Sequence, residues 1–134
     1  MLELTHAAWM AMIGHAYDGL PDEACGLLAG PIGSDRVTAF YPCRNAAASS
    51  KLYAIEYPEI EAADTDAASR GLDLKGTMHS HTHTDAYPSP TDVQMADPSW
   101  CYVIVSLRQD APVLRAYRIR GDTIVEQQVA RSDH

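Results

Sequence analysis

Three of the six histidines lie within five residues, in the run Met78-His-Ser-His-Thr-His83. Residues i and i+2 of a β-strand face the same side, so His79 and His81 can present two imidazoles to one point. Two such side chains are a natural start for a zinc site, which needs at least one more protein ligand. A His-x-His pair also occurs by chance on exposed strands, so the pair alone does not establish a metal site.

Asp92 is the candidate for the third ligand. It follows the proline-rich run Tyr87-Pro-Ser-Pro-Thr-Asp92, which would turn the chain back toward the histidines. Two histidines and one aspartate leave a fourth tetrahedral position for water, as in catalytic zinc sites. The alternative is a helix start, with Ser89 as the N-cap, Pro90 at the first helical position and Asp92 as the acidic member of a capping box. We expect Asp92 to be a ligand or a cap but not both, whereas the Ser89 hydroxyl can serve two roles.

Other reactive side chains have simpler explanations when each is taken alone. Glu23 precedes the apolar run Ala24–Gly30, where an exposed carboxylate is the ordinary outcome. Cys25, within that run, could be the nucleophile of a Cys-His hydrolase, but a buried and inert thiol is the simpler interpretation. We expect the loop Thr84-Asp-Ala86 to carry His83 away from the other histidines, so His83 is left outside the ligand set.

The elements that would position these residues follow from the hydrophobic spacing. Helices are expected over residues 5–17, 58–71 and 89–96, the first with Thr5 as its cap and Gly19 as its stop. Strands are expected over residues 24–30, 36–41, 53–57, 75–81, 101–107, 113–119 and 123–129. This order predicts an α/β or α+β protein in which helices flank a mixed β-sheet, with one domain over residues 1–134.

Composition and charge exclude several classes of protein. The hydrophobic fraction of 46% and the charged fraction of 21% are those of an ordinary globular protein, and no apolar stretch approaches the ~18 residues of a membrane span. A net charge of −8 argues against nucleic-acid binding. The five arginines after residue 100 predict solvated strand faces or, alternatively, a patch for an acidic protein partner.

The cysteines and the first residues indicate the cellular compartment in which the protein works. Three cysteines without a C-x-x-C motif predict reduced thiols rather than disulfides. The opening Met1-Leu-Glu-Leu-Thr5 has an acid where a signal peptide would have Lys or Arg. We therefore expect a cytoplasmic protein without a membrane partner.

At the candidate residues the chain resembles the JAMM (MPN⁺) metallopeptidases. Their pattern is a Glu at the first helix-to-strand turn, then His-Ser-His, a Pro-Ser loop and an Asp; here Glu23, His79-Ser-His81, Pro88-Ser89 and Asp92 match it in order and spacing. The resemblance implies His79, His81 and Asp92 as ligands of Zn²⁺, Glu23 as the general acid/base and Ser89 as a donor to the oxyanion. It also implies a mixed-sheet JAMM domain with cytidine-deaminase-like layering.

Two positions depart from the family pattern. Thr82 stands where the family often has Pro, and His83 is an additional imidazole. An alternative register that pairs His81 with His83 fails, because it would place Gln94 where the acid belongs.

Within the family, the short chain and the runs Pro21-Asp-Glu-Ala-Cys-Gly26 and Ala86-Tyr-Pro-Ser89 are most similar to the bacterial Mec-type enzymes. The resemblance implies hydrolysis of the amide bond after the C-terminal Gly-Gly of a small ubiquitin-like sulfur carrier protein, which releases cysteine. Two alternatives stay open: an isopeptidase that removes ubiquitin-like modifiers from lysine, and a non-catalytic MPN scaffold. The oligomeric state is also open, a homodimer being one alternative.

Overall fold

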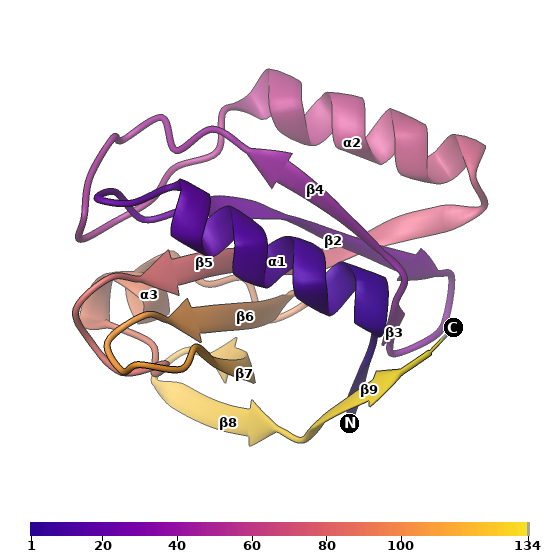
Figure 1. Cartoon of the computed structure of the whole chain (residues 1–134). Helices are drawn as coiled ribbons and strands as arrows, with labels where there is room; N and C mark the ends of the chain where they lie inside the picture. The colour runs from indigo at the N-terminus through magenta and orange to yellow at the C-terminus, as the bar shows by residue number, and fades with distance from the viewer. Residues whose placement is uncertain (134) are drawn as a thin grey trace.

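The computed structural model describes residues 1–133 (Figure 1). In this part of the chain, a six-stranded mixed sheet has the order β4-β2-β5-β6-β7-β8 and a three-stranded sheet has the order β3-β1-β9. The strands are β1 (Leu2–Thr5), β2 (Cys25–Pro31), β3 (Arg36–Val37), β4 (Ala39–Cys43), β5 (Leu72–His81), β6 (Cys101–Ser106), β7 (Val113–Arg120), β8 (Thr123–Gln127) and β9 (Val129–Ser132). The helices are α1 (His6–Asp18), α2 (Tyr57–Ser69) and α3 (Pro90–Met95). The expected mixed sheet with flanking helices is confirmed.

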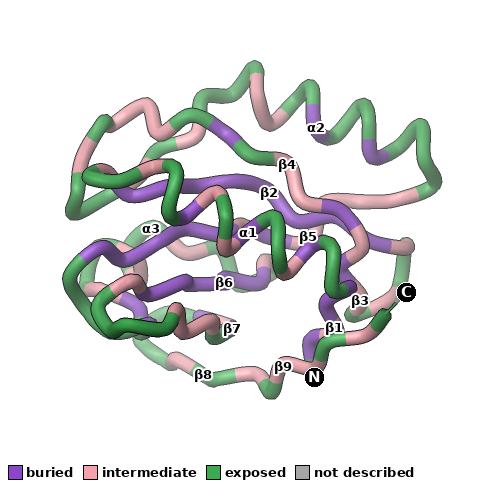
Figure 2. Tube along the Cα trace, in the orientation of Figure 1, coloured by how far each residue is buried: buried purple, intermediate pink, exposed green. Residues whose placement is uncertain are grey.

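Helix α1 covers one face of the large sheet, and α2 and α3 cover the other. Successive side chains of the buried strands point to opposite faces, so each of these strands packs against helices on both sides. On β2, Leu28 belongs to the apolar cluster that contains Met12 of α1, whereas Leu27 belongs to the cluster that contains Ala63 of α2. On β6, Val103 packs on the α1 side and Ile104 packs on the side of α3. Strands β2 and β6 are buried along nearly all of their length, and β5 is buried mainly toward its C-terminal end (Figure 2).

A bulge in β5 determines which residues of this strand face α2 and α3. Leu28 pairs with Gly76 but Ala29 pairs with Leu74, so Lys75 is the extra residue. Before the bulge, Leu72 and Leu74 pack on the side of α2; beyond it, Met78 packs on the side of α1. The bulge thus shifts the alternation so that the odd-numbered residues near the end of β5, including the histidines, face α2 and α3.

The connection from β5 to β6 carries the chain from the C-terminal end of β5 back across the sheet to the start of β6. These strands are parallel neighbours, and α3 lies within the segment that joins them. Their backbones approach closely at Gly76, where an added Cβ would collide with the carbonyl oxygen of Cys101. The start of α3 lies near the C-terminal end of β5, from which the connection begins.

Several expected elements differ from the observed ones. The capped helix after Thr5 is confirmed, with Gly19 at its C-cap. The expected strand over 36–41 is divided into β3 and β4, which belong to different sheets. The expected strand over 53–57 is wrong: Ala54 bonds to the side chain of Asn45 and to the backbone of Ala46 rather than to a neighbouring strand. The short strands β1 and β9 were not expected, because each is stabilised by a partner distant in sequence.

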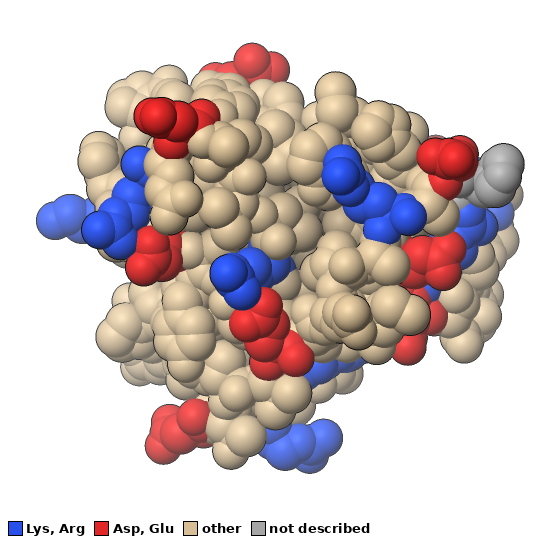
Figure 3. Space-filling view, turned by 60° about the horizontal axis from the view of Figure 1, so that its bottom comes forward, with Lys and Arg blue, Asp and Glu red and all other residues tan. Residues whose placement is uncertain are grey.

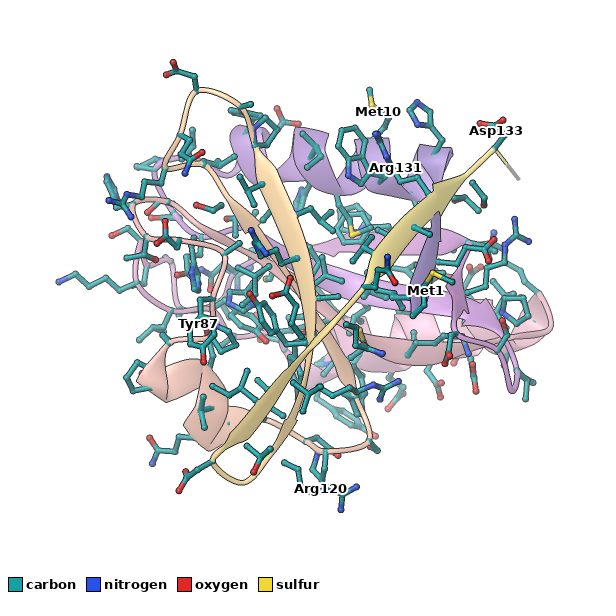
Figure 4. All side chains as sticks on the ribbon, turned by 90° about the horizontal axis from the view of Figure 1, so that it is seen from below. Met1, Met10, Tyr87, Arg120, Arg131 and Asp133 are labelled. Carbon is teal, nitrogen blue, oxygen red and sulfur yellow. The ribbon has the colours of Figure 1, made fainter. Side chains whose placement is uncertain are left out.

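Charged side chains of both signs are intermingled on the face shown in Figure 3. In the C-terminal third, Arg108 pairs with Asp85 at 2.8 Å and Arg115 pairs with Glu126 at 2.9 Å. Arg131 on β9 lies against α1, 4.2 Å from the ring centroid of Trp9 (Figure 4). Over residues 1–133, no helix combines the length and the apolar character needed to cross a bilayer.

Candidate active site

His79 and His81 lie at the C-terminal end of β5 and are nearly inaccessible to solvent, with exposed fractions of 1% and 3%. Their Nε2 atoms are 3.2 Å apart. Asp92, on the first turn of α3, places its Oδ2 atom 3.1 Å from each of these nitrogens. The structure thus brings together the three side chains that the sequence suggested as metal ligands.

The three atoms fit a single divalent ion. In a tetrahedral zinc site with bonds of about 2.0–2.1 Å, neighbouring ligand atoms are about 3.3 Å apart, close to the 3.1–3.2 Å separations of His79 Nε2, His81 Nε2 and Asp92 Oδ2. Two imidazole nitrogens and one carboxylate oxygen are also donors that zinc accepts. Within the described residues, no other group of three His, Cys, Asp or Glu side chains converges in this way.

The two histidine rings are oriented by different contacts. The carbonyl oxygen of Asp85 lies 2.7 Å from His81 Nδ1, which donates to it and so turns Nε2 toward Asp92. His79 Nδ1 has no hydrogen-bond partner among residues 1–133, and the ring instead stacks on Tyr53 with the centroids 4.4 Å apart. Burial lowers the pKa of His79, which favours the neutral imidazole that metal ligation requires.

The loop between β5 and α3 is anchored to the strands behind it. The Ser106 hydroxyl donates to the carbonyl oxygen of Thr84, and the Tyr117 hydroxyl donates to the carbonyl oxygen of Ala86. Tyr87, labelled in Figure 4, packs edge-on against the Tyr117 ring. These contacts fix the loop backbone that orients His81.

Asp92 has two structural roles at once. Its Oδ2 accepts a hydrogen bond from the Ser89 backbone N–H at 2.9 Å, and its own N–H donates to Ser89 Oγ at 3.0 Å. The capping box is therefore real, and it leaves Oδ2 facing both imidazoles, so the cap does not keep Asp92 from serving as a ligand. One lone pair of Oδ2 can accept the Ser89 N–H while another faces the imidazoles. Burial opposes ionisation, but hydrogen bonds from His79 and His81 outweigh it and hold the pKa of Asp92 well below its usual range.

Glu23 is 4% exposed, in contrast to the surface carboxylate that its position alone suggests. The next residue, Ala24, bonds to Ser80 between the two histidines, through Ala24 N to Ser80 Oγ at 2.7 Å and Ser80 N to Ala24 O at 2.9 Å. In the described chain, Glu23 Oε1 has no hydrogen-bond partner. Burial raises the pKa of Glu23 to about 7, while His81 lowers it and Asp92 raises it. A buried carboxyl group with such a pKa can take up and release a proton near neutral pH.

An apolar cavity of about 390 Å³ adjoins His79 and Asp92. The rest of its wall comes from strands β2, β5, β6 and β7, from helices α2 and α3, and from the segments that precede α2 and β6; it includes Leu27, Ile60 and Trp100. Sequence reasoning did not find this cavity, because its walls come from segments that are distant in sequence. Its position beside these two candidate ligands suits the binding of a peptide segment.

The remaining reactive side chains lie outside this arrangement. Cys25, Cys43 and Cys101 are free thiols and are buried. Burial raises the pKa of Cys25 to about 12, with a further contribution from Cys43, so its thiolate is scarce at neutral pH. His83 is exposed and its Nδ1 lies 2.7 Å from Thr82 Oγ1, outside the ligand group as expected.

This fold, with two buried imidazoles, a carboxylate and a second, unpaired carboxyl group nearby, is that of a JAMM-type hydrolase. The family model described as prokaryotic homologs of the JAB domain matches residues 5–120, and the chain belongs to this family. The resemblance inferred from Glu23, His79-Ser-His81 and Asp92 is thereby confirmed.

Similar proteins from several organisms agree with this membership. The chain is 43% identical over 124 residues to a CysO-cysteine peptidase of Mycobacterium tuberculosis, covering 89% of this chain and 83% of the relative. It is 35% identical over 111 residues to a desampylase of Haloferax volcanii, covering 78% of this chain and 80% of the relative.

Solved structures show the same fold. The solution structure of protein DSY2949 from Desulfitobacterium hafniense has a TM-score of 0.92 and 34% identity, covering all of this chain and 94% of that one. A JAB1/MPN domain protein of Archaeoglobus fulgidus has a TM-score of 0.66 and 18% identity, covering 97% and 98% of the two chains.

Proposed function

We propose that the protein hydrolyses the amide bond after the C-terminal Gly-Gly of a small ubiquitin-like sulfur carrier and so releases cysteine. The observation that carries this proposal is the convergence of His79, His81 and Asp92 beside a buried Glu23 carboxyl group with a free oxygen. The 43% identity to a CysO-cysteine peptidase supports the choice of substrate. The proposed catalytic unit is the single domain of residues 1–134.

The proposed cofactor is Zn²⁺, held by His79 Nε2, His81 Nε2 and Asp92 Oδ2. When bound there, it would polarise the substrate carbonyl and lower the pKa of a water molecule toward ~7. Glu23 takes a proton from the attacking water and later delivers it to the departing amine, a role worth roughly 10²–10⁴-fold in rate. Its raised pKa suits both transfers, because the proton is neither held too tightly nor lost too easily at neutral pH.

Ser89 is the proposed donor to the oxyanion of the tetrahedral intermediate. Its Oγ already accepts the Asp92 N–H, so the hydroxyl hydrogen remains available to donate. The capping interaction fixes the serine next to Asp92, and a fixed donor loses little orientational freedom as charge develops on the substrate.

The direct experiment uses purified protein and a carrier that ends in Gly-Gly-Cys. We expect release of free cysteine, loss of this activity on chelation and its recovery with zinc. Glu23→Gln is the matched control for contaminating peptidases, because it removes the base without removing a ligand. Cysteine release by wild-type and Glu23→Gln protein at equal rates would contradict the proposal.

A second candidate function is the removal of ubiquitin-like modifiers from protein lysines, which the 35% identity to a desampylase favours. This activity uses the same residues on a different amine, so a two-substrate assay separates the candidates. The proposed function predicts faster turnover of the carrier-cysteine adduct than of a protein-lysine isopeptide.

A non-catalytic scaffold is disfavoured by the complete ligand set, and it predicts no bound metal in the purified protein. We place the activity in the cytoplasm, where the free thiols of Cys25, Cys43 and Cys101 would stay reduced.

A further inference from the structure

The loop between β4 and α2, residues 44–56, is built around the side chain of Asn45, the chain's only asparagine. The Asn45 Oδ1 atom accepts hydrogen bonds from Ala47 N at 3.0 Å and Ala54 N at 3.1 Å. Its Nδ2 atom donates to Leu52 O at 3.0 Å and to Glu23 O at 2.9 Å. One amide group therefore connects both ends of this loop to the residue proposed as the base.

The loop holds the backbone of Glu23 on both sides of its Cα atom. The Glu23 N–H donates to Ser49 O at 2.8 Å, and the Glu23 carbonyl accepts from Asn45 Nδ2. Both partners belong to the same loop, and Asn45 Nδ2 also lies 3.4 Å from Ser49 O. The carboxyl end offers no comparable restraint, because Glu23 Oε1 has no hydrogen-bond partner in the described residues. The direction of the Glu23 side chain is thus set by its backbone and by packing.

Asparagine is the side chain that suits this position. The contacts require two N–H donors and one oxygen acceptor on a short, rigid side chain, which is what a primary amide provides. Aspartate would keep the bonds from Ala47 and Ala54 but would face the carbonyl oxygens of Glu23 and Leu52 with a carboxylate. Alanine would remove all of these bonds, including the one to the part-buried carbonyl oxygen of Glu23.

We propose that Asn45 is a positioning residue that fixes the Glu23 backbone, and through it the Glu23 carboxyl group, for proton transfer. This inference rests on the proposed role of Glu23 as the general acid/base. Asn45 acts at the backbone of Glu23, so its effect should appear in the chemical step rather than in metal binding or substrate affinity.

The test compares Asn45→Asp and Asn45→Ala with Lys51→Ala. Lys51 lies in the same loop and is exposed, and its side chain makes no hydrogen bond or ion pair to the described residues. We expect both Asn45 variants to lower kcat about 10- to 100-fold, since a displacement of about 1 Å can cost ~10²-fold. KM should change less than about twofold and zinc content should stay at that of the wild type, while Lys51→Ala should match the wild type throughout.

Backbone amide exchange supplies a readout that does not depend on any substrate. Loss of the Asn45 donors should speed exchange of the Glu23 N–H at least ~10-fold, with the amides of β6 unchanged. If wild-type protein fails to release cysteine, the proposed function is wrong, but the exchange measurement still tests the role of Asn45.

Two results would overturn the inference. The first is unchanged exchange at Glu23 in a folded Asn45→Asp protein, which keeps the Ala47 and Ala54 bonds and so should remain folded even where Asn45→Ala does not. The second is a double variant in which Asn45→Asp lowers kcat of the Glu23→Gln protein by the same factor as it lowers kcat of the wild type. A residue that acts through the Glu23 carboxyl group should have no further effect once that group is replaced.

Discussion

Replacing Glu23 with glutamine should stabilise the metal-free protein at pH 8 but hardly at pH 5. Burial raises the pKa of Glu23 from 4.5 to about 7 in the folded state. The unfolded chain therefore loses this proton at lower pH than the folded chain. The contribution of Glu23 to folding is fully present below pH 4.5 and is lost as the pH rises through 7. Glutamine resembles the protonated acid in shape but has no proton to lose, so it avoids this loss.

The size of the effect follows from the pKa of Glu23. Each tenfold change in proton affinity corresponds to about 1.4 kcal/mol, so the full difference between 4.5 and about 7 gives an upper limit of about 3 kcal/mol. Solvent screening reduces this upper limit, and we expect about 1–2 kcal/mol at pH 8.

The assay is urea unfolding of chelator-treated wild-type and Glu23→Gln proteins at pH 5, 6, 7 and 8. The histidines and Asp92 are present in both proteins, so their titration largely cancels in the difference. We expect the stability advantage of the variant to grow between pH 5 and pH 7 and to level off toward pH 8. An advantage that is the same at every pH, or that shrinks with rising pH, would refute the argument that burial raises the pKa of Glu23.

Other substitutions and reagents separate the remaining roles. Glu23→Gln should retain zinc, measured by elemental analysis, while kcat falls about 10²–10⁴-fold; persistent activity would remove Glu23 as the base. His81→Ala and Asp92→Ala should lose zinc and activity together. Full zinc content in either variant would show that the replaced residue is not a ligand. Ser89→Ala should lower kcat about 10²-fold at unchanged zinc content and cost about 1 kcal/mol of helix stability through the lost cap; normal kcat would exclude the oxyanion role. Iodoacetamide should leave activity intact because Cys25 is buried with a raised pKa, whereas a Cys25 nucleophile would be inactivated by alkylation and would survive chelation.

The sequence could single out the three candidate metal ligands, which the structure brings together, because their pattern is local. His79 and His81 are two residues apart on one strand, and Asp92 follows on the next short helix. The helix caps Thr5 and Ser89 were predictable for the same reason, since a cap is read from a few neighbouring residues.

The face on which the histidines lie could not be predicted from simple alternation along β5. Leu72 and Leu74 suggest that the even-numbered residues face α2, and the bulge at Lys75 reverses this pattern. Gly76 was a usable signal, because an isolated glycine in a strand often marks a bulge or a close approach of two backbones.

Contacts between distant segments were also beyond local patterns. Ala24 and Ser80 are 56 residues apart, and their hydrogen bonds bring Glu23 to the histidines. At the sequence level only the family resemblance joined them. Nothing in the local sequence distinguishes Asn45 from other polar loop residues. The pattern of residues 53–57 favours a strand, but the Ala54 N–H donates to the Asn45 side chain instead of to a neighbouring strand.

Titration of zinc into chelated protein, with cysteine release from a Gly-Gly-Cys-terminated carrier as the signal, tests the central idea most directly. The proposed site of His79, His81 and Asp92 occurs once per chain, so activity should rise from baseline and reach its plateau at one zinc per chain. Full activity in the chelated protein before any zinc is added would contradict a metal-dependent hydrolase at this site.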